Sequence, residues 1–389
     1  MKEWKKVKLK DCCLSISDGD HLPPPKTNCG IPFITISNID STNHIDFSDT
    51  LFVPKDYYEK LDPIRKAQEN DILYSVVGSF GKPVLIKDNK EFVFQRHIAI
   101  LRPDNTLADS RFLYYIMLTR DFFMQADSVA VGAAQRTVSL TSLRNMEVSL
   151  PNIETQHHIA TILSRYDSLI ENYQKQIKLL EEAAQRLYKE WFVDLHFPGH
   201  ENAKIVDGVP EGWEKKTIGD IVIYYDKQRK PLSAMQRMNM EKIYPYYGAA
   251  ALMDYVDSYL FDGIYLLFGE DGTVITPDNF PVLQYVWGKF WVNNHAHVLR
   301  GKDGISTEFL YSMFKEMPIA DVVTGAAQPK ISQGRLSDKK ILMPSLELVQ
   351  KWSCITNHYY ESIRLITEKI RLLTETRDRL LPKLMNGEL

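Results

Sequence analysis

The sequence predicts an α+β fold in which two mixed α/β domains are separated by two long helices that pair as an antiparallel coiled coil. The main observation is an internal repeat. Gly132-Ala133-Ala134-Gln135 recurs as Gly325-Ala326-Ala327-Gln328, and Pro151 recurs as Pro344, with one offset throughout (325 − 132 = 193 and 344 − 151 = 193). A register kept without a gap means that one structural unit occurs twice, which gives the chain an internal pseudo-twofold repeat.

Length and composition agree with this organisation. A chain of 389 residues suits two domains of about 150 residues with extended elements between them. Hydrophobic residues make up 44% and charged residues 25%, as in globular proteins. The sequence contains no secretory signal, no apolar run long enough for a membrane span and no zinc-ligand spacing among its four cysteines. We therefore expect a cytoplasmic protein without a membrane partner.

Residues 1–150 are expected to form the first globular domain. Three runs rich in β-branched and aromatic residues predict strands, at 31–36, 72–77 and 92–101. Gly78 to Pro83 forms a glycine turn with a basic residue, and 111–118 is expected to be a helix that packs on the sheet. Residues 198–344 repeat this plan with almost entirely different side chains, so the scaffold is duplicated while the surfaces have diverged.

Two long helices are expected at 151–197 and 345–389. Asn152 and Ser345 stand at equivalent positions as N-cap residues, and Glu154 and Glu347 put negative charge in each first turn, where the helix dipole favours it. Apolar residues then recur at spacings of three and four, which predicts a coiled-coil seam. The seam residues are Ile162, Tyr166, Ile170, Tyr173, Ile177, Leu180, Leu187, Ile355, Tyr359, Ile363, Ile366, Ile370, Leu373 and Leu380.

The chain order predicts how these helices pair. The first runs away from the first domain and the second begins at the second domain, so packing of the two seams requires an antiparallel arrangement. A helix of roughly 37 residues would be about 55 Å long.

The motifs of catalysis are missing from the sequence. Paired carboxylates, an activated nucleophile, a glycine-rich cofactor loop and a Pro-Pro-aromatic motif do not occur at recognisable spacing. His295 and His297 alternate along an expected strand and share a face, but a third metal ligand is not evident, so a structural role is favoured over a metal site. We expect no catalytic residue, no metal and no cofactor in this chain.

The order of globular region, long helix, globular region and long helix resembles the specificity subunit of type I restriction-modification enzymes. The duplicated turn and helix start, the openings at 4–11 and 212–220, and the ending at 379–389 fit the same family. The resemblance covers essentially the whole chain.

This resemblance implies that each globular region is a target recognition domain that reads one half of a bipartite double-stranded DNA site. The helices would set the gap between the halves and dock two DNA methyltransferase (modification) subunits, which use S-adenosylmethionine. Restriction (motor-nuclease) subunits, which use ATP and Mg, are further partners where they are present. Because the two domains differ in sequence, the site is expected to be asymmetric.

Candidates for DNA contact follow from chemistry, since amides bind adenine edges and Arg or Lys bind guanine or phosphate. In the first domain they are Ser37, Asn38, Ser79, Lys82, Gln95, Arg96, Gln135 and Arg136, and in the second Lys227, Arg229, Tyr247, Asn293, Asn294, Gln328 and Lys330. For each residue a surface or turn role without DNA contact stands beside this interpretation. The alternative for the whole chain is a non-catalytic scaffold whose coiled coil joins two protein-binding domains.

Overall fold

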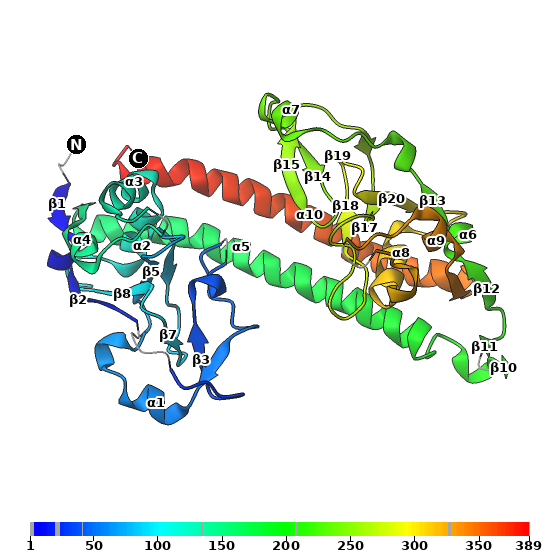
Figure 1. Ribbon diagram of the computed structural model, residues 1–389, viewed down its shortest axis with the longest axis horizontal. Coiled ribbons are helices and arrows are strands. Elements are labelled where there is room, and N and C mark those ends of the chain that lie inside the picture. Colours follow the sequence, from blue (N-terminus) through cyan, green and yellow to red (C-terminus); the bar gives the residue numbers. More distant parts are fainter. Residues whose placement is uncertain are drawn as a thin grey trace. The chain divides into compact units, whose positions relative to one another are not determined.

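The computed structural model describes residues 4–19, 24–40, 42–133, 135–206, 209–325 and 328–388 (Figure 1). Three alanines of the repeated turn, Ala134, Ala326 and Ala327, lie outside these ranges. The chain divides into two compact units: unit 1 consists of Met1–Glu171 with Arg371–Leu389, and unit 2 of Asn172–Ile370. Each unit therefore combines a globular region with segments of both long helices.

Unit 1 is built on an antiparallel sheet of four strands, β2-β8-β5-β6, with bounds Cys13–Asp18, Ile98–Pro103, Ile72–Ser75 and Pro83–Leu85. A second sheet, β4-β3-β7, consists of Leu51–Val53, Ile31–Ile34 and Val93–Phe94, with β3 and β7 parallel. β1 (Lys5–Lys8) pairs with β9 (Glu147–Leu150). The helices are α1 (Lys55–Lys60), α2 (Ser110–Leu118), α3 (Arg120–Val129) and α4 (Leu140–Asn145), with 3-10 turns η1 (Leu9–Asp11), η2 (Ile36–Asn38) and η3 (Pro63–Arg65).

These elements confirm most of the local predictions for the first domain. The strands expected at 31–36 and 72–77 are β3 and β5, and the expected helix is α2, whose Asp109 cap accepts a hydrogen bond from Phe112 N at 2.9 Å. The strand expected at 92–101 is divided into β7 and β8 by a turn at 95–97. α2 buries Phe112 and Leu113 completely, so the expected packing of this helix on the core is confirmed.

Unit 2 repeats this plan. One sheet, β13-β20-β17-β18, consists of Val222–Tyr224, Ala296–Gly301, Tyr265–Gly269 and Leu283–Val286; the other, β15-β14-β19-β16, of Leu252–Val256, Tyr244–Tyr247, Lys289–Val292 and Phe261–Asp262. β12 (Glu214–Thr217) pairs with β21 (Lys340–Met343), and β10 (Ile205–Val206) with β11 (Val209–Pro210). The helices are α6 (Ile218–Ile221), α7 (Ala234–Met238), α8 (Thr307–Lys315) and α9 (Gln333–Asp338), with η5 (His200–Asn202), η6 (Asp226–Gln228) and η7 (Ala320–Val322).

The offset found in the sequence is also an offset between structural elements. α9 begins 193 residues after α4 (333 − 140), β21 begins 193 after β9 (340 − 147), and the second long helix begins 193 after the first (346 − 153). The repeat is therefore a short helix, an edge strand and a long helix in fixed succession. This confirms that the duplicated sequence encodes one structural unit.

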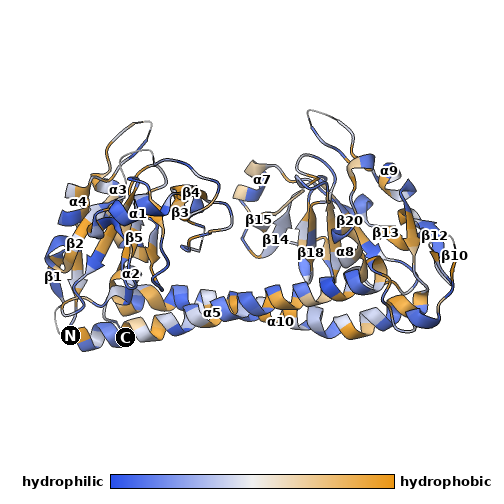
Figure 2. Ribbon diagram, turned by 90° about the horizontal axis from the view of Figure 1, so that it is seen from below, coloured by the Kyte–Doolittle hydropathy of each residue, from blue (hydrophilic) through white to orange (hydrophobic). Residues whose placement is uncertain are grey.

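The long helices begin where their caps predict. α5 (Ile153–Tyr188) follows Asn152, whose Oδ1 accepts a hydrogen bond from Thr155 N at 2.8 Å, and α10 (Leu346–Met385) follows Ser345, whose Oγ accepts from Leu348 N at 3.4 Å. α5 continues into a π-helical turn, η4 (Lys189–Val193). Hydrophobic and hydrophilic residues alternate along both helices (Figure 2), and no helix among the described residues is long and apolar enough to cross a membrane.

Within each unit, segments of α5 and α10 lie side by side. In unit 1, Arg377 on α10 donates to Asp167 on α5 at 2.7 Å, and Tyr115 on α2 donates to the same carboxylate at 2.5 Å. In unit 2, the rings of Tyr188 on α5 and Trp352 on α10 are 6.0 Å apart. The two helices thus contribute to the core of both units.

The most buried face of the helices differs from the predicted seam. Ile355 is 42% exposed, whereas Trp352 and Tyr360 are 0% and 2% exposed. Ile170, Ile363 and Ile366 are buried, and the remaining predicted seam residues are half-buried: Ile162, Tyr166, Tyr173, Ile177, Leu180, Leu187, Tyr359, Ile370, Leu373 and Leu380. The physical reason is that each helix also packs on the globular region, since Trp352 contacts Phe309 of α8 at 5.7 Å between rings. The buried face is therefore rotated from the heptad seam toward α2 and α8.

A loop of unit 1 is tied to α5 through a carboxylate. Glu171 Oε1 lies 3.1 Å from His44 Nε2 and also accepts a hydrogen bond from Lys87. The hydrogen bond from His44, followed by that from Lys87, lowers the pKa of Glu171 to about 2. The residues therefore join two distant loops to the first long helix.

This lowered pKa predicts a loss of stability in acid. A carboxyl group whose pKa is lowered on folding stabilises the native state above its unfolded pKa, and that contribution disappears as the pH falls from about 4.5 toward 2. Because the site is partly open to water, we expect the contribution to be at most ~2 kcal/mol. Urea unfolding at pH 6 should give the native chain a higher free energy of unfolding than Glu171→Gln. This difference should shrink steadily below pH 4.5. A difference independent of pH would contradict this assignment.

Candidate nucleic-acid interface

Four segments of unit 1 meet beyond the ends of β3, β5 and β7. This unit 1 loop cluster consists of residues 35–38, 78–82, 95–97 and the repeated turn 131–137, of which Ala134 is not described. Backbone hydrogen bonds join the segments: from Gln95 N to Ile34 O (3.1 Å), from Val76 N to His97 O (2.9 Å) and from Gly78 N to Arg136 O (2.9 Å). All eight DNA-contact candidates of the first domain lie in this cluster.

Unit 2 builds the same arrangement with other residues. Its loop cluster consists of residues 226–229, 247, 270–273, 293–295 and the described part of 324–330. The joining hydrogen bonds run from Asn293 N to Tyr247 O (3.1 Å), from Glu270 N to His295 O (2.8 Å) and from Gly272 N to Pro329 O (3.1 Å). The structure therefore also brings together the seven candidates of the second domain, which lie far apart in the sequence.

The glycine of the repeated turn explains why this turn recurs. Gly132 and Gly325 have φ of 113° and 83°, a region that favours glycine. A Cβ at either position would lie 2.5 Å from Gln135 O or 2.4 Å from Gln328 O. The turn therefore closes in the same way in both units, and it places a glutamine at the same point of each cluster.

The exposure of the candidates divides them into three groups. Exposed are Ser37, Ser79, Arg96, Gln135, Arg136, Lys227, Asn294, Gln328 and Lys330; half-buried are Asn38, Lys82, Gln95, Arg229 and Tyr247; and Asn293 is buried. The first group is accessible to a ligand, although Arg136 and Gln328 each donate a hydrogen bond to a neighbouring carboxylate. The others support the loops or need a side chain to move before they can contact DNA.

Two candidates in unit 1 show these different situations. Arg136 donates to Asp127 O at 2.5 Å and stacks over the ring of Phe80 at 5.6 Å, which holds an exposed guanidinium in a defined place. Asn38 instead donates to Asp49 O at 2.9 Å and accepts from Thr35 N at 3.0 Å. Its amide is occupied in shaping the 35–38 turn, which is a structural role.

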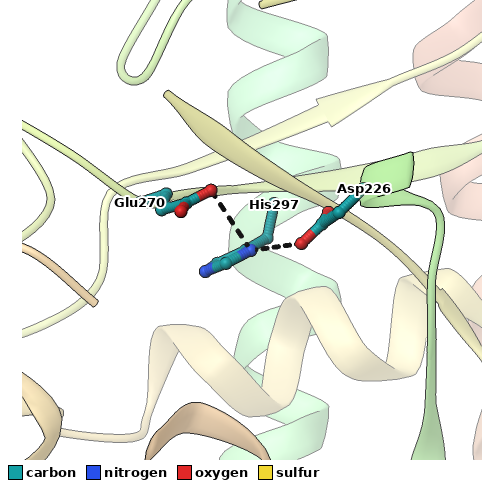
Figure 3. Close-up of side chains that lie close together, drawn as sticks. All are labelled: Asp226, Glu270 and His297. Atoms are coloured by element: carbon teal, nitrogen blue, oxygen red, sulfur yellow. Dashed lines mark hydrogen bonds and ion pairs between the residues drawn. The ribbon is translucent and has the colours of Figure 1, made fainter. Parts of the chain in front are cut away.

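Unit 2 contains a buried network of charges directly under its loop cluster. His297, on β20, is 1% exposed, and its Nδ1 lies 2.6 Å from Asp226 Oδ2 (Figure 3). Its Nε2 lies 2.9 Å from Ile331 O. Both neighbours are oxygen acceptors, so both ring nitrogens of His297 have a polar partner. Glu270 Oε2 lies 3.5 Å from the same Nδ1. Three chain segments are thereby held together beneath the loops.

Arg229 completes this network. The sequence predicts Arg229 as a DNA contact, but its guanidinium is only 12% exposed and donates to Glu270 Oε2 and Ala296 O, each at 2.6 Å, while lying 3.4 Å from Asp226 Oδ2. Its charge therefore supports the cluster from below.

The same network bears on the question of a metal site. Ligand atoms of Asp226, Glu270 and His297 lie within 4.8 Å of one another, a grouping that a cation could use. Arg229 already supplies positive charge to both carboxylates, and His297 donates to one of them. The donor set is therefore better explained as an internally neutralised ion-pair network than as a metal centre. His295 does not share it, since its exposed ring lies 3.5 Å from Asp271 instead.

Unit 1 has apolar residues at two positions of this network, those of Glu270 and His297. Val76 makes the same backbone contacts as Glu270: its N–H donates to His97 O, and its carbonyl accepts from Val138 N at 2.9 Å, as that of Glu270 accepts from Ile331 N at 2.9 Å. Ala99 pairs with Tyr74 as His297 pairs with Phe268. Two similar scaffolds thus have chemically different supports.

Asp226, Glu270 and Asp271 lie in the unit 2 loop cluster and were not among the residues predicted for the site. Asp271 accepts a hydrogen bond from Gln328 Nε2 at 2.8 Å, so it orients one of the predicted DNA contacts. A signal was available for Glu270 and Asp271, because they form a pair of acids at the end of a strand that is otherwise apolar. Apart from the pair of Asp226 with Arg229, three residues later, the partners of these acids come from segments tens of residues away and could not be identified from the sequence.

Comparison with known proteins matches the description of these two units. The family model "Type I restriction modification DNA specificity domain" matches residues 1–182 and 210–375. The MjaIX specificity subunit of Methanocaldococcus jannaschii is 27% identical over 304 residues, covering 72% of this chain and 69% of the relative, and the HindI specificity subunit of Haemophilus influenzae is 21% identical over 484 residues, covering both completely. The crystal structure of a type I S subunit from M. genitalium superimposes with a TM-score of 0.61 at 20% identity, over 98% of this chain and 96% of that one, which shows the shared fold.

Specificity subunits are the non-catalytic DNA-recognition components of type I restriction-modification systems, and this confirms the prediction that the chain is a recognition subunit. The family model matches each of the two globular regions together with part of the long helix that follows it. The chain therefore belongs to the type I restriction modification DNA specificity family.

Proposed function

We propose that each globular region reads one half of an asymmetric, bipartite DNA site through its loop cluster. The target recognition domains are residues 1–150 and 198–344. The observation that carries the proposal is the pair of loop clusters: the same backbone hydrogen-bond scheme is built twice, while the exposed side chains on it differ. A fixed scaffold with variable side chains suits a protein that reads two different half-sites.

The charges of the two clusters support different readouts. Arg96 and Arg136 are exposed in unit 1 with Lys82 half-buried beside them, a basic set suited to guanine and phosphate. In unit 2, Lys227 and Lys330 are accompanied by Asp271, which is an acceptor and suits the amino group of a base. The half-sites are therefore expected to differ.

The long helices, 151–197 and 345–389, are proposed to pair as an antiparallel coiled coil that fixes the spacing between half-sites. The contacts of Asp167 with Arg377 and of Tyr188 with Trp352 support this direction, because later residues of α5 meet earlier residues of α10. The 36 residues of α5 correspond to about 54 Å, which exceeds one turn of DNA, about 34 Å. Two methyltransferase subunits would dock on this helical region.

The proposal is tested by purifying the chain with the methyltransferase encoded beside it and sequencing modified bases in DNA exposed to the complex. We expect one bipartite, asymmetric methylated motif that depends on this chain. An active methyltransferase that modifies DNA without such a motif would favour a scaffold that joins protein-binding domains.

Replacing Arg96 by alanine tests the assignment of one loop cluster to one half-site. Arg96 is exposed in the unit 1 cluster, so its loss should weaken recognition of one half by about 1–3 kcal/mol, which is read as a roughly 5- to 150-fold loss of affinity. Binding is measured on DNA altered in either half. Lys55→Ala, an exposed lysine on α1, is the control for lost charge. An equal loss on both altered DNAs would contradict the assignment.

A further inference from the structure

An open groove lies in unit 1 beside the start of the chain. This Trp4 groove has a volume of about 1170 Å³ and is bordered by β1, the first turns of α5 and the last turns of α10. Its apolar lining includes Trp4, Ile159 and Leu384. It lies apart from the loop cluster, and the proposed DNA readout does not use it.

The internal repeat shows what fills the equivalent place in unit 2. Trp213 directly precedes β12 as Trp4 directly precedes β1. Its ring lies 6.3 Å from Phe192 and 6.0 Å from Phe197, and both phenylalanines are only 8% exposed. These residues belong to the segment that follows α5. In unit 2, therefore, an aromatic segment covers the tryptophan.

The corresponding residues of unit 1 lack these rings. The offset of 193 aligns Leu384 with Trp191 (384 − 191) and Met385 with Phe192 (385 − 192). Beside Trp4 lies Gly387, whose ideal Cβ position is 3.2 Å from the indole nitrogen, so the neighbour of this ring has no side chain. Trp4 contacts Phe112 instead, at 5.9 Å between rings. Among the described residues, the ring of Trp4 contacts one aromatic ring, whereas that of Trp213 contacts two rings of the segment that follows α5.

The charges at the border of the groove favour an acidic occupant. Lys5, Lys6 and His158 are exposed and line it, against one acid, Asp11. The segment that covers Trp213 carries two exposed acids, Glu190 and Asp194, close to its aromatic residues. An occupant of this composition would match both the apolar floor and the basic border of the Trp4 groove.

We propose that the Trp4 groove is a docking site for a partner protein segment that carries two or more aromatic residues flanked by acids. The aromatic residues pack against Trp4 and the apolar ends of α5 and α10, as Phe192 and Phe197 pack against Trp213. Each buried aromatic ring removes roughly 150–250 Å² from water, which supplies the driving force. The lysines of β1 select the acidic flank.

The test uses a peptide probe with the sequence of residues 189–200, the chain's own aromatic and acidic segment, added to the intact chain. Binding is measured by isothermal titration calorimetry. We expect saturable binding with one site, and at least a tenfold loss when Trp191, Phe192 and Phe197 of the peptide are replaced by alanine.

Two matched variants locate the site. His158→Trp places a large ring in the groove and should weaken peptide binding at least tenfold. Lys351→Trp changes the equivalent position of the second copy (351 − 158 = 193), which does not line the groove, and should leave binding unchanged. Lys6→Glu should weaken binding more than Lys10→Glu, since Lys6 lines the groove and Lys10 does not.

Absence of saturable binding to the native chain would overturn the proposal. So would equal binding to the His158→Trp and Lys351→Trp chains, because the peptide would then occupy another surface, such as that of its own counterpart in unit 2. Neither result depends on DNA recognition, which is measured separately with Arg96→Ala.

Discussion

Replacing Arg229 by alanine is expected to destabilise unit 2 by about 3–5 kcal/mol and to abolish recognition of one half-site. The guanidinium neutralises two partly buried carboxylates, Asp226 and Glu270. Its removal leaves them next to one another, with the ring of His297 and the more distant ammonium of Lys330, 3.9 Å from Glu270 Oε1, as the remaining partners. Breaking one partner of a buried ion pair costs far more than the pair contributes, because the remaining charge cannot be solvated.

The measurement is urea unfolding of the intact chain, followed by binding to DNA altered in either half. Lys227→Ala is the matched control, since this lysine lies two residues away and is exposed. It should leave stability within about 0.5 kcal/mol of the native value. Adding Glu270→Gln to Arg229→Ala should recover part of the lost stability, since it removes one uncompensated charge. Similar unfolding curves for Arg229→Ala and Lys227→Ala would show that the network does not stabilise unit 2.

Replacing Trp352 by alanine is expected to cost about 3–5 kcal/mol, the range for truncating a large buried aromatic residue. Trp352 is 0% exposed and its ring meets those of Tyr188, Phe192 and Phe309. The loss should separate the two long helices from the core of unit 2. Its indole N–H has no hydrogen-bond partner among the residues that the structure describes, so Trp352→Phe removes an unsatisfied donor and should cost much less.

Ile355→Ala is the control for this prediction. The heptad pattern places Ile355 in the seam, but the residue is 42% exposed, so its truncation should cost less than about 1 kcal/mol. Thermal or urea unfolding of the three variants measures the order directly. A greater loss for Ile355→Ala than for Trp352→Ala would restore the predicted seam and would mean that the two helices contact each other through a different face.

The sequence predicted what depends on local pattern or on the repeat. The caps at Asn152 and Ser345 set the helix starts. Gly132 and Gly325 each mark a turn with a positive φ, which residues other than glycine adopt only with strain. The constant offset identified these features twice. Strand and helix types followed from β-branched runs and periodicity, with errors mainly at boundaries such as the turn at 95–97.

The buried face of the helices could not be predicted from the heptad pattern alone. Spacing of three and four locates an apolar stripe, but the stripe here is wide enough to serve both a helix and a globular region. Which part is most buried depends on where α2 and α8 lie. Trp352 and Thr356, both fully buried, were therefore left out of the predicted seam in favour of Ile355.

The assignment of the fifteen candidates to DNA contact stays a prediction. The structure brings all fifteen into the two loop clusters, but the residues that support these clusters could not be foreseen. Arg229, however, looks like any other basic turn residue in the sequence. Its place among Asp226, Glu270 and His297 depends on tertiary contacts between segments about 30 to 70 residues apart, which no local pattern encodes.

The contrast between Val76 and Glu270 constrains how the two halves of the molecule can diverge. Under the unit 1 cluster, an apolar residue such as Val76 or Ala99 can be exchanged for another of similar size, one position at a time. Under the unit 2 cluster, the replacement of any one charged residue leaves its partners without their counter-charge. Arg229, Glu270 and Asp226 therefore have to change together. The core under the unit 1 cluster should therefore tolerate many more single substitutions than the core under the unit 2 cluster.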